Sequence, residues 1–222
     1  MQLKTTVARL ALLGVAVEAR ARWRLGPAPA FSERDASGPF TTLVAFMPRP
    51  VAEEISRLVQ QLPGLEGHFR YPPAQIHMTV RNLDGVELGE LPNVLSQVPP
   101  IKLRTARLHF TPETLLLQLA PSDRTLRSLR AQLDELPGAR PSARARPTLA
   151  FANVLRLNGP VSSELRIGVR RAGGELGGRP VELHELQLLS TDKVGSPDRT
   201  HMLGRYALAD GAGERSRSTG RL

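Results

Sequence analysis

The chain has 222 residues, of which 41% are hydrophobic, and it contains no cysteine. This length suits one domain or two small lobes that share a core, and the composition is that of a globular protein. The lack of cysteine excludes a disulfide scaffold, a thiolate zinc site and a cysteine nucleophile. It also fits the reducing cytoplasm, where we expect the protein to reside.

Basic residues outnumber acidic ones, with 30 Lys+Arg against 21 Asp+Glu and a formal net charge of +9. A field of this sign attracts polyanions, and the planar donor fork of arginine matches phosphate oxygens. A high-GC genome that favours arginine codons would give the same excess, so both explanations stay open. Aromatic residues are only 4% of the chain, which argues against a stacking platform for single-stranded nucleic acid.

The two ends of the chain differ from its middle. Apolar residues at steps of three and four predict a helix over residues 3–25, and a linker rich in Pro, Gly and Ser follows it up to residue 39. Arg20 and Arg22 lie where a signal peptide needs small neutral residues, and no apolar run is long enough to span a membrane. Residues 210–222 are expected to form a disordered basic tail.

Residues 40–209 contain a strand–helix–strand pattern twice. The first copy has a strand at Phe40–Phe46, a helix at Val51–Leu62, a stop at Pro63-Gly64 and a strand at Gln75–Arg81. The second copy has a strand at Thr114–Leu119, a leucine-rich helix that ends before Pro137-Gly138, and a strand at Arg146–Leu155. Further strands are expected at Ile101–Phe110, Pro180–Ser190 and His201–Leu208, paired antiparallel. The glycine pairs at 173–174 and 177–178 indicate a surface hairpin.

Residues two apart in a strand project from the same face. His77 and Thr79 therefore point together, while Met78 between them points into the core, and Arg146 and Thr148 stand in the same relation in the second copy. Leu149 and Phe151 are expected on the opposite, buried face. If a twofold axis relates the copies, one cleft holds an imidazole, a guanidinium and two hydroxyls, a set that matches a phosphate. A packed core histidine is the alternative for His77 alone.

No pair of histidines or carboxylates has the spacing of a metal site, so we expect no metal and no cofactor. The spacing of the remaining four histidines supports no catalytic role for any of them. They are His68, His109, His184 and His201.

The segments IHMTVRNLDG and ARPTLAFANV, with the flanking strands, resemble the two motifs of the two-histidine (2H) phosphoesterases, the 2′-5′ RNA ligase and cyclic phosphodiesterase family. The resemblance covers residues 40–209, and Arg146 stands where the second histidine of the family belongs. It implies an α+β fold of two pseudo-symmetric lobes of antiparallel sheet, with helices outside and a central groove. The expected N-terminal helix is an extension of this fold.

The resemblance also implies a reaction. One histidine takes a proton while the other protonates the leaving oxygen, and the threonines donate hydrogen bonds to phosphoryl oxygens. Arg146 stays protonated, so it binds phosphate but cannot act as a base. We therefore expect a metal-independent phosphodiesterase acting on 2′,3′-cyclic or 2′-5′ phosphodiesters of RNA or nucleotides, with His77, Thr79 and Thr148 as catalytic residues.

In this scheme Arg146, Thr79 and Thr148 bind the substrate, turnover is impaired, and the protein is a monomer with no membrane partner. A catalytically inactive RNA- or nucleotide-binding module of the same fold is the second hypothesis. A purely structural relic is the third.

Overall fold

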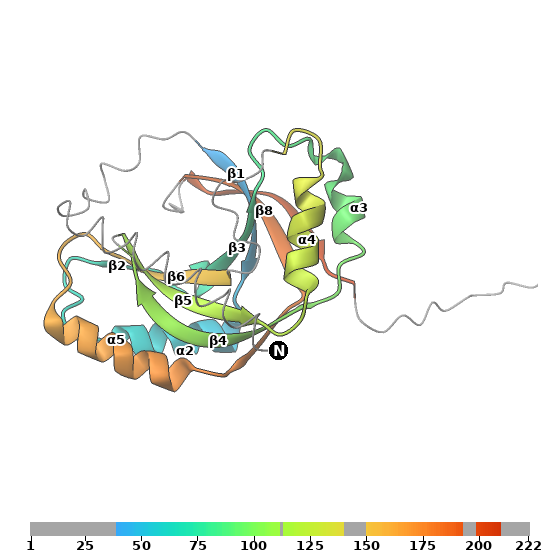
Figure 1. Ribbon diagram of the computed structural model, residues 1–222. Helices are drawn as coiled ribbons and strands as arrows, with labels where there is room; N and C mark the ends of the chain where they lie inside the picture. Colours follow the sequence, from blue (N-terminus) through green and yellow to red (C-terminus); the bar gives the residue numbers. More distant parts are fainter. Residues whose placement is uncertain (1–38, 112, 140–149, 193–198, 210–222) are drawn as a thin grey trace, which may run out of the picture.

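The computed structural model describes residues 39–111, 113–139, 150–192 and 199–209, and all strands within them belong to one curled sheet (Figure 1). The strand order is β7-β4-β5-β6-β3-β1-β8-β9, and β2 pairs with β6 off this path. Every neighbouring pair is antiparallel. The α+β class and the antiparallel pairing expected from the sequence are thereby confirmed.

The strands are β1 (Phe40–Phe46), β2 (Phe69–Arg70), β3 (His77–Asn82), β4 (Ile101–Phe110), β5 (Thr114–Pro121), β6 (Ala150–Arg156), β7 (Pro180–Leu183), β8 (Glu185–Thr191) and β9 (His201–Ala207). The helices are α2 (Arg49–Gln60), α3 (Leu91–Leu95), α4 (Thr125–Asp134) and α5 (Ser163–Leu176), with 3₁₀ turns η2 (Pro73–Gln75) and η3 (Leu88–Glu90). The expected N-terminal helix and linker, apart from residue 39, and the expected tail lie outside the described residues.

The strand order is symmetric about its centre, where β3 lies beside β6. Moving outward, β1 matches β5, β8 matches β4 and β9 matches β7. The chain also forms helices at matching points, because α2 and α4 follow β1 and β5, while α3 and α5 follow β3 and β6. These are the two pseudo-symmetric lobes that the repeated pattern predicts.

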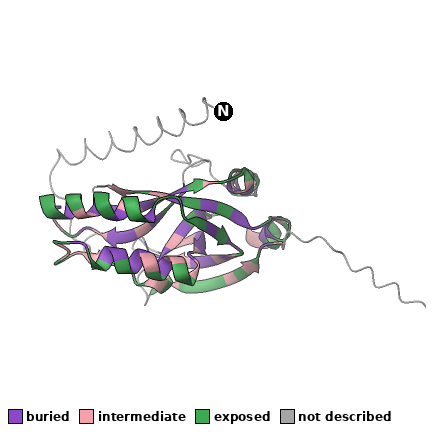
Figure 2. Cartoon of the chain, turned by 90° about the horizontal axis from the view of Figure 1, so that it is seen from below, coloured by how far each residue is buried: buried purple, intermediate pink, exposed green. Residues whose placement is uncertain are grey.

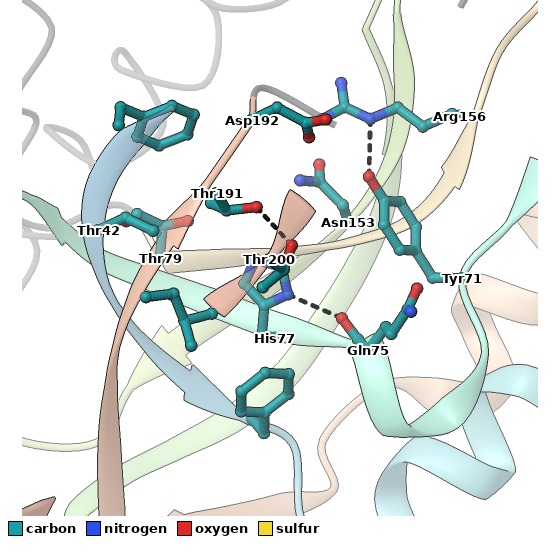
Figure 3. A pocket seen from close by; sticks show the side chains of 13 residues that line it. Thr42, Tyr71, Gln75, His77, Thr79, Asn153, Arg156, Thr191, Asp192 and Thr200 are labelled. Atoms are coloured by element: carbon teal, nitrogen blue, oxygen red, sulfur yellow. Dashed lines mark hydrogen bonds between the residues drawn. The ribbon is translucent and has the colours of Figure 1, made fainter. Parts of the chain in front are cut away.

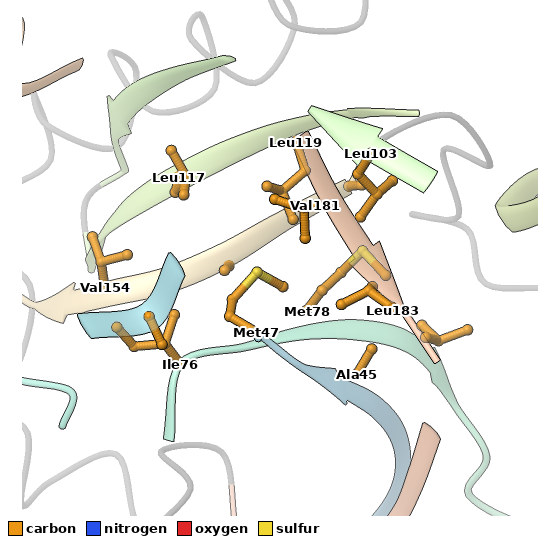
Figure 4. Packing of buried hydrophobic residues seen from close by; sticks show 14 of the residues in the cluster. Ala45, Met47, Ile76, Met78, Leu103, Leu117, Leu119, Val154, Val181 and Leu183 are labelled. Atoms are coloured by element: carbon orange, nitrogen blue, oxygen red, sulfur yellow. The ribbon is translucent and has the colours of Figure 1, made fainter. Parts of the chain in front are cut away.

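Two helix pairs cover the same side of the sheet. Helices α2 and α5 pack together over β6 and β4, and helices α3 and α4 pack together near β9 and β3 (Figure 1). The helix sides that face the sheet are buried, while their outer sides are exposed (Figure 2). Apolar residues of both lobes merge into a single core, with Met78, Leu117 and Val154 among its fully buried members (Figure 4).

Several expected boundaries need correction. Helix α2 begins at Arg49 rather than Val51, because Pro48 stands at its N-cap and Pro50 supplies a residue suited to the first turn. Strand β3 begins at His77 rather than Gln75, because Pro73–Gln75 form a 3₁₀ turn in which Ile76 N–H donates to Pro73 O at 3.2 Å.

The single strand expected at Pro180–Ser190 is wrong. Its residues form two strands that break at His184, and β7 pairs with β4 while β8 pairs with β1. The two strands therefore belong to opposite halves of the sheet. The apolar alternation changes phase at this break, from Val181 and Leu183 to Leu186 and Leu188.

The surface hairpin expected around the glycine pairs is also wrong, since Gly173 and Gly174 lie inside helix α5. The Ser162 hydroxyl accepts from Leu165 N–H at 3.1 Å and caps this helix. Glycine is used here for close packing: a Cβ at Gly173 would lie 3.3 Å from the backbone nitrogen of Leu108 on β4. The glycines let the helix lie directly on the sheet, although glycine is less favourable than alanine inside a helix.

Candidate active site

A cavity of about 330 Å³ opens at the centre of the sheet, on the face that alternates with the core (Figure 3). Residues of both lobes line it. They are Phe40, Thr42, Phe46, Tyr71, Gln75, His77, Thr79, Asn153, Arg156, Leu189, Thr191, Asp192 and Thr200.

His77 and Thr79 both line this cavity, as their two-residue spacing in β3 predicts. The alternating residues Ile76, Met78 and Val80 are buried, with at most 3% of their surface exposed. The Phe46 ring lies beside the imidazole, with centroids 5.5 Å apart and planes tilted by 58°. The strand therefore presents one polar face to the cavity and one apolar face to the core.

A main-chain contact fixes the tautomer of His77. Its Nδ1 lies 2.7 Å from the carbonyl oxygen of Gln75, and a carbonyl can only accept, so Nδ1 carries the hydrogen. The lone pair of the neutral ring is then at Nε2. Burial lowers the pKa of His77 below its ordinary value of 6.5, the Gln75 hydrogen bond opposes this shift, and the Arg156 charge adds to it. The side chain is consequently a neutral base at pH 7.

Hydroxyl groups surround one side of the cavity. The Thr191 and Thr200 hydroxyl oxygens lie 2.7 Å apart, and the Thr42 hydroxyl donates to Arg81 O at 3.3 Å. Together with Thr79 they give the described part of the cavity four threonine hydroxyls, from β1, β3, β8 and the segment before β9. Such groups can reorient to donate to phosphoryl oxygens.

The opposite side of the cavity holds Tyr71 and Arg156. Arg156 Nε donates to the Tyr71 hydroxyl at 2.8 Å, and the buried carboxyl group of Asp192 also lines this side. Tyr71 is 4% exposed. Burial raises the pKa of its phenol, and the neighbouring guanidinium opposes that shift. Arg156 therefore brings a permanent cation to the cavity.

The other two site residues expected from the sequence, Arg146 and Thr148, lie outside the described residues. Among the described residues, the pairing of β3 with β6 identifies the position in the second lobe that corresponds to His77. Met78 pairs with Ala152 where β3 meets β6. A twofold axis through this pair relates His77 to Phe151 and Thr79 to Asn153.

Two β-bulges support the same register. Val80 is the extra residue of β3, since Thr79 and Arg81 pair with the successive residues Val44 and Leu43. Val154 is the extra residue of β6, since its neighbours Asn153 and Leu155 pair with two successive residues of β5. The bulge follows Thr79 by one residue in the first lobe and Asn153 by one residue in the second. This register differs from the match with Arg146-Pro147-Thr148 drawn from the sequence.

The expectation that Phe151 points into the core is wrong. Phe151 is 42% exposed, whereas Ala150 and Ala152 are at most 1% exposed. Asn153, two residues further along β6, lines the cavity, so Phe151 shares its face of the sheet. At the positions that match His77 and Thr79, the second lobe therefore carries Phe151 and Asn153, neither of which ionises. Asn153 lines the cavity, whereas Phe151 is not among its lining residues.

Solved structures of three bacterial proteins share this architecture. The conserved protein of unknown function ATU0111 from Agrobacterium tumefaciens str. C58 is 14% identical, with a TM-score of 0.57 over 84% of this chain and 92% of its own. TT0787 of Thermus thermophilus is 16% identical, with a TM-score of 0.55 over 78% and 99%. E. coli LigT complexed with ATP is 16% identical, with a TM-score of 0.51 over 78% and 100%. The chain has the LigT fold. No protein-family model and no curated protein matches its sequence.

Within this LigT fold, sequence reasoning missed Tyr71, Gln75, Asn153 and Arg156. A spacing signal for the second lobe was present, since 14 residues separate Pro63 from His77 and 14 separate Pro137 from Phe151. The glycines after these prolines, Gly64 and Gly138, both adopt positive φ, at 68° and 79°. The match of Thr79 with Thr148 instead paired His77 with Arg146, which lies five residues before Phe151. No local pattern links Tyr71 to Arg156, which lies 85 residues away.

None of the other histidines is among the residues that line this cavity. His109 Nε2 lies 2.9 Å from the Gln118 side-chain oxygen, and His68 Nδ1 accepts from Asn158 N–H at 3.2 Å. Within the described ranges, no three His, Asp or Glu side chains gather as a metal site would require. None of the helices in those ranges has the length and apolarity needed to cross a membrane.

Proposed function

We propose that the cavity binds a 2′,3′-cyclic or 2′-5′ phosphodiester of RNA or a nucleotide and hydrolyses it slowly without a metal. The observation that carries this proposal is the orientation of His77, whose Nδ1 is held by Gln75 O while Nε2 keeps its lone pair. A neutral imidazole held in this way takes a proton from an attacking water.

The remaining groups of the cavity suit a nucleotide. Arg156 offers charge-assisted hydrogen bonds to a phosphate, and the threonine hydroxyls offer neutral ones. Three aromatic side chains, Phe40, Phe46 and Tyr71, also line the cavity and present apolar surface to a nucleobase. Gln75 Oε1 is buried with no hydrogen-bond partner among the described residues, so a hydroxyl or amino group of the ligand would satisfy it.

Resemblance in fold adds a weaker argument. E. coli LigT, with which this chain shares its fold, has been solved with ATP, and the present cavity is large enough for part of such a ligand. The excess of basic residues fits an RNA or nucleotide partner as well. We propose that the protein acts as a monomer in the cytoplasm.

The first test measures hydrolysis of 2′,3′-cyclic nucleotides by purified protein in EDTA. We expect slow release of a phosphomonoester, reduced about 10²–10⁴-fold in His77→Gln because the base is lost. Thr125→Ala, at the first residue of α4 and outside the cavity, is a control that should keep full activity. Equal product from wild type and His77→Gln would reject the catalytic proposal.

The second candidate is a nucleotide-binding module without turnover, and the position of Phe151 and Asn153 favours it. Binding is measured by calorimetry with a nonhydrolysable nucleotide. The module is supported if wild type binds without turnover and if Arg156→Met weakens the affinity. Arg146→Met, measured in parallel, tests the phosphate ligand expected from the sequence.

A further inference from the structure

Among the described residues, the second lobe offers no obvious proton donor at the positions that match His77 and Thr79. Phe151 carries no polar group, and an asparagine such as Asn153 donates hydrogen bonds without releasing a proton. Hydrolysis of a ribose phosphodiester expels an alkoxide, which needs a proton as it leaves. If the proposed hydrolysis takes place, another group beside β6 must supply that proton.

We propose that Tyr71 is this general acid and that Arg156 stabilises the phenolate it leaves, an inference that rests on the proposed hydrolysis. Tyr71 directly follows β2, and its N–H donates to Val154 O of β6 at 3.4 Å. Its hydroxyl accepts from Arg156 Nε at 2.8 Å. In Figure 3 the Tyr71 hydroxyl points toward Arg156, away from the Gln75 contact that holds His77.

The surroundings hold the phenol firmly. The Phe69 ring meets the Tyr71 ring edge-on, with centroids 5.2 Å apart, and only 4% of Tyr71 is exposed. Of the described residues, Arg156 from β6 and Asp192 just after β8 bring charge to it, and they act on its pKa in opposite directions. Because burial raises the pKa, the phenol keeps its proton at neutral pH and can donate it in the transition state.

Nε2 of His77 takes a proton from water while the water oxygen forms a bond to phosphorus. The bond from phosphorus to the 2′- or 3′-oxygen of ribose breaks, and the electron pair goes to that oxygen. The Tyr71 hydroxyl gives its proton to the same oxygen and becomes a phenolate beside the Arg156 guanidinium. Solvent then carries the proton from the His77 imidazolium back to Tyr71.

The test varies the leaving group. A 2′,3′-cyclic nucleotide needs the acid, whereas thymidine 3′-(4-nitrophenyl phosphate) releases 4-nitrophenolate without protonation. We expect Tyr71→Phe to lose about 10²-fold or more in kcat on the cyclic nucleotide, and less than about threefold on the aryl diester. His77→Gln should lose activity on both. Tyr206→Phe is the matched control, because it removes the other tyrosine hydroxyl from β9, outside the cavity.

A second measurement uses the pH profile on the cyclic nucleotide. Wild-type kcat should fall at alkaline pH as Tyr71 loses its proton, and this fall should vanish in Tyr71→Phe. Similar losses on both substrates, no loss on the cyclic nucleotide, or an alkaline fall that survives in Tyr71→Phe would overturn the role of Tyr71 and leave the proposed function standing. Wild type that hydrolyses neither substrate would overturn both. Unchanged circular dichroism and thermal unfolding check that each variant folds.

Discussion

Met78 and Ala152 face each other where the two central strands meet, and both are fully buried. The residues next to them in each strand point the other way, toward the cavity face. His77 and Thr79 stand on either side of Met78, and Phe151 and Asn153 stand on either side of Ala152. The contact between Met78 and Ala152 thus lies between two unequal halves of the cavity. The first half carries the ionisable His77, and the matching positions of the second half carry no ionisable group.

This register predicts how a second histidine could be installed. In the double variant Phe151→His and Asn153→Thr, β6 would carry the same side chains as β3. We expect turnover of a 2′,3′-cyclic nucleotide to rise at least about tenfold, toward the ~10²–10⁴-fold range of one added acid or base. Arg146→His is the comparison, and a gain there with none in the double variant would contradict the register.

The half-buried position of His77 in the cavity predicts its titration. Its pKa is lowered, so the ring should stay neutral below pH 6.5, and activity should persist to a lower pH than a solvent-exposed histidine would allow. NMR titration of the imidazole measures this directly. Arg156→Met should raise the pKa, because the neighbouring positive charge is removed. A His77 that titrates above pH 6.5 would contradict the prediction.

The lowered pKa of His77 also makes the stability of the folded protein depend on pH. The unfolded state binds a proton at His77 more readily than the folded state, so stability is complete above pH 6.5 and falls as the pH drops through the lowered pKa. His77→Gln should remove this part of the acid dependence. Urea unfolding at several pH values between about 4 and 8 gives the two curves, and parallel curves would argue against the shift.

Arg130 supports the bulge next to Thr79. It donates from Nε to Val80 O at 2.9 Å and from Nη2 to Thr79 O at 3.1 Å. Burial lowers the pKa of Arg130 to about 10, yet the side chain stays charged at neutral pH. Arg130→Met should leave these carbonyls without that donor and cost roughly 1–3 kcal/mol of unfolding free energy. Arg127→Met, exposed on the same helix, should change stability by less than about 0.5 kcal/mol.

Gly138 should tolerate no side chain. Its φ is 79°, and a Cβ there would collide with the carbonyl oxygen of Gly85. Gly138→Ala should therefore destabilise the protein by more than about 1 kcal/mol. Gly89→Ala is the control, because nothing lies within 4 Å of the Cβ that it would add. Equal unfolding midpoints for the two variants would count against the close contact.

Local patterns explain which parts of the fold the sequence could predict. The strands Phe40–Phe46 and Ile101–Phe110 have the expected bounds, since their β-branched and alternating residues report burial directly. Helix α5 was missed because its glycines, such as Gly168 against Pro63, serve packing that only the tertiary structure shows. The cavity was half predicted: the face shared by His77 and Thr79 follows from strand geometry, whereas the contact between Tyr71 and Arg156 depends on chain topology.

The acceptor that orients His77 is the main-chain carbonyl of Gln75. The tautomer of the imidazole and the ligand preference of the cavity can therefore be changed independently. Replacing the Gln75 side chain leaves the carbonyl in place, so the protonation pattern of the imidazole does not depend on which amino acid occupies position 75. That side chain, with its buried oxygen, can therefore be exchanged to change which ligands are admitted. A library randomised at this one codon would screen for altered ligand preference while every member kept the same base.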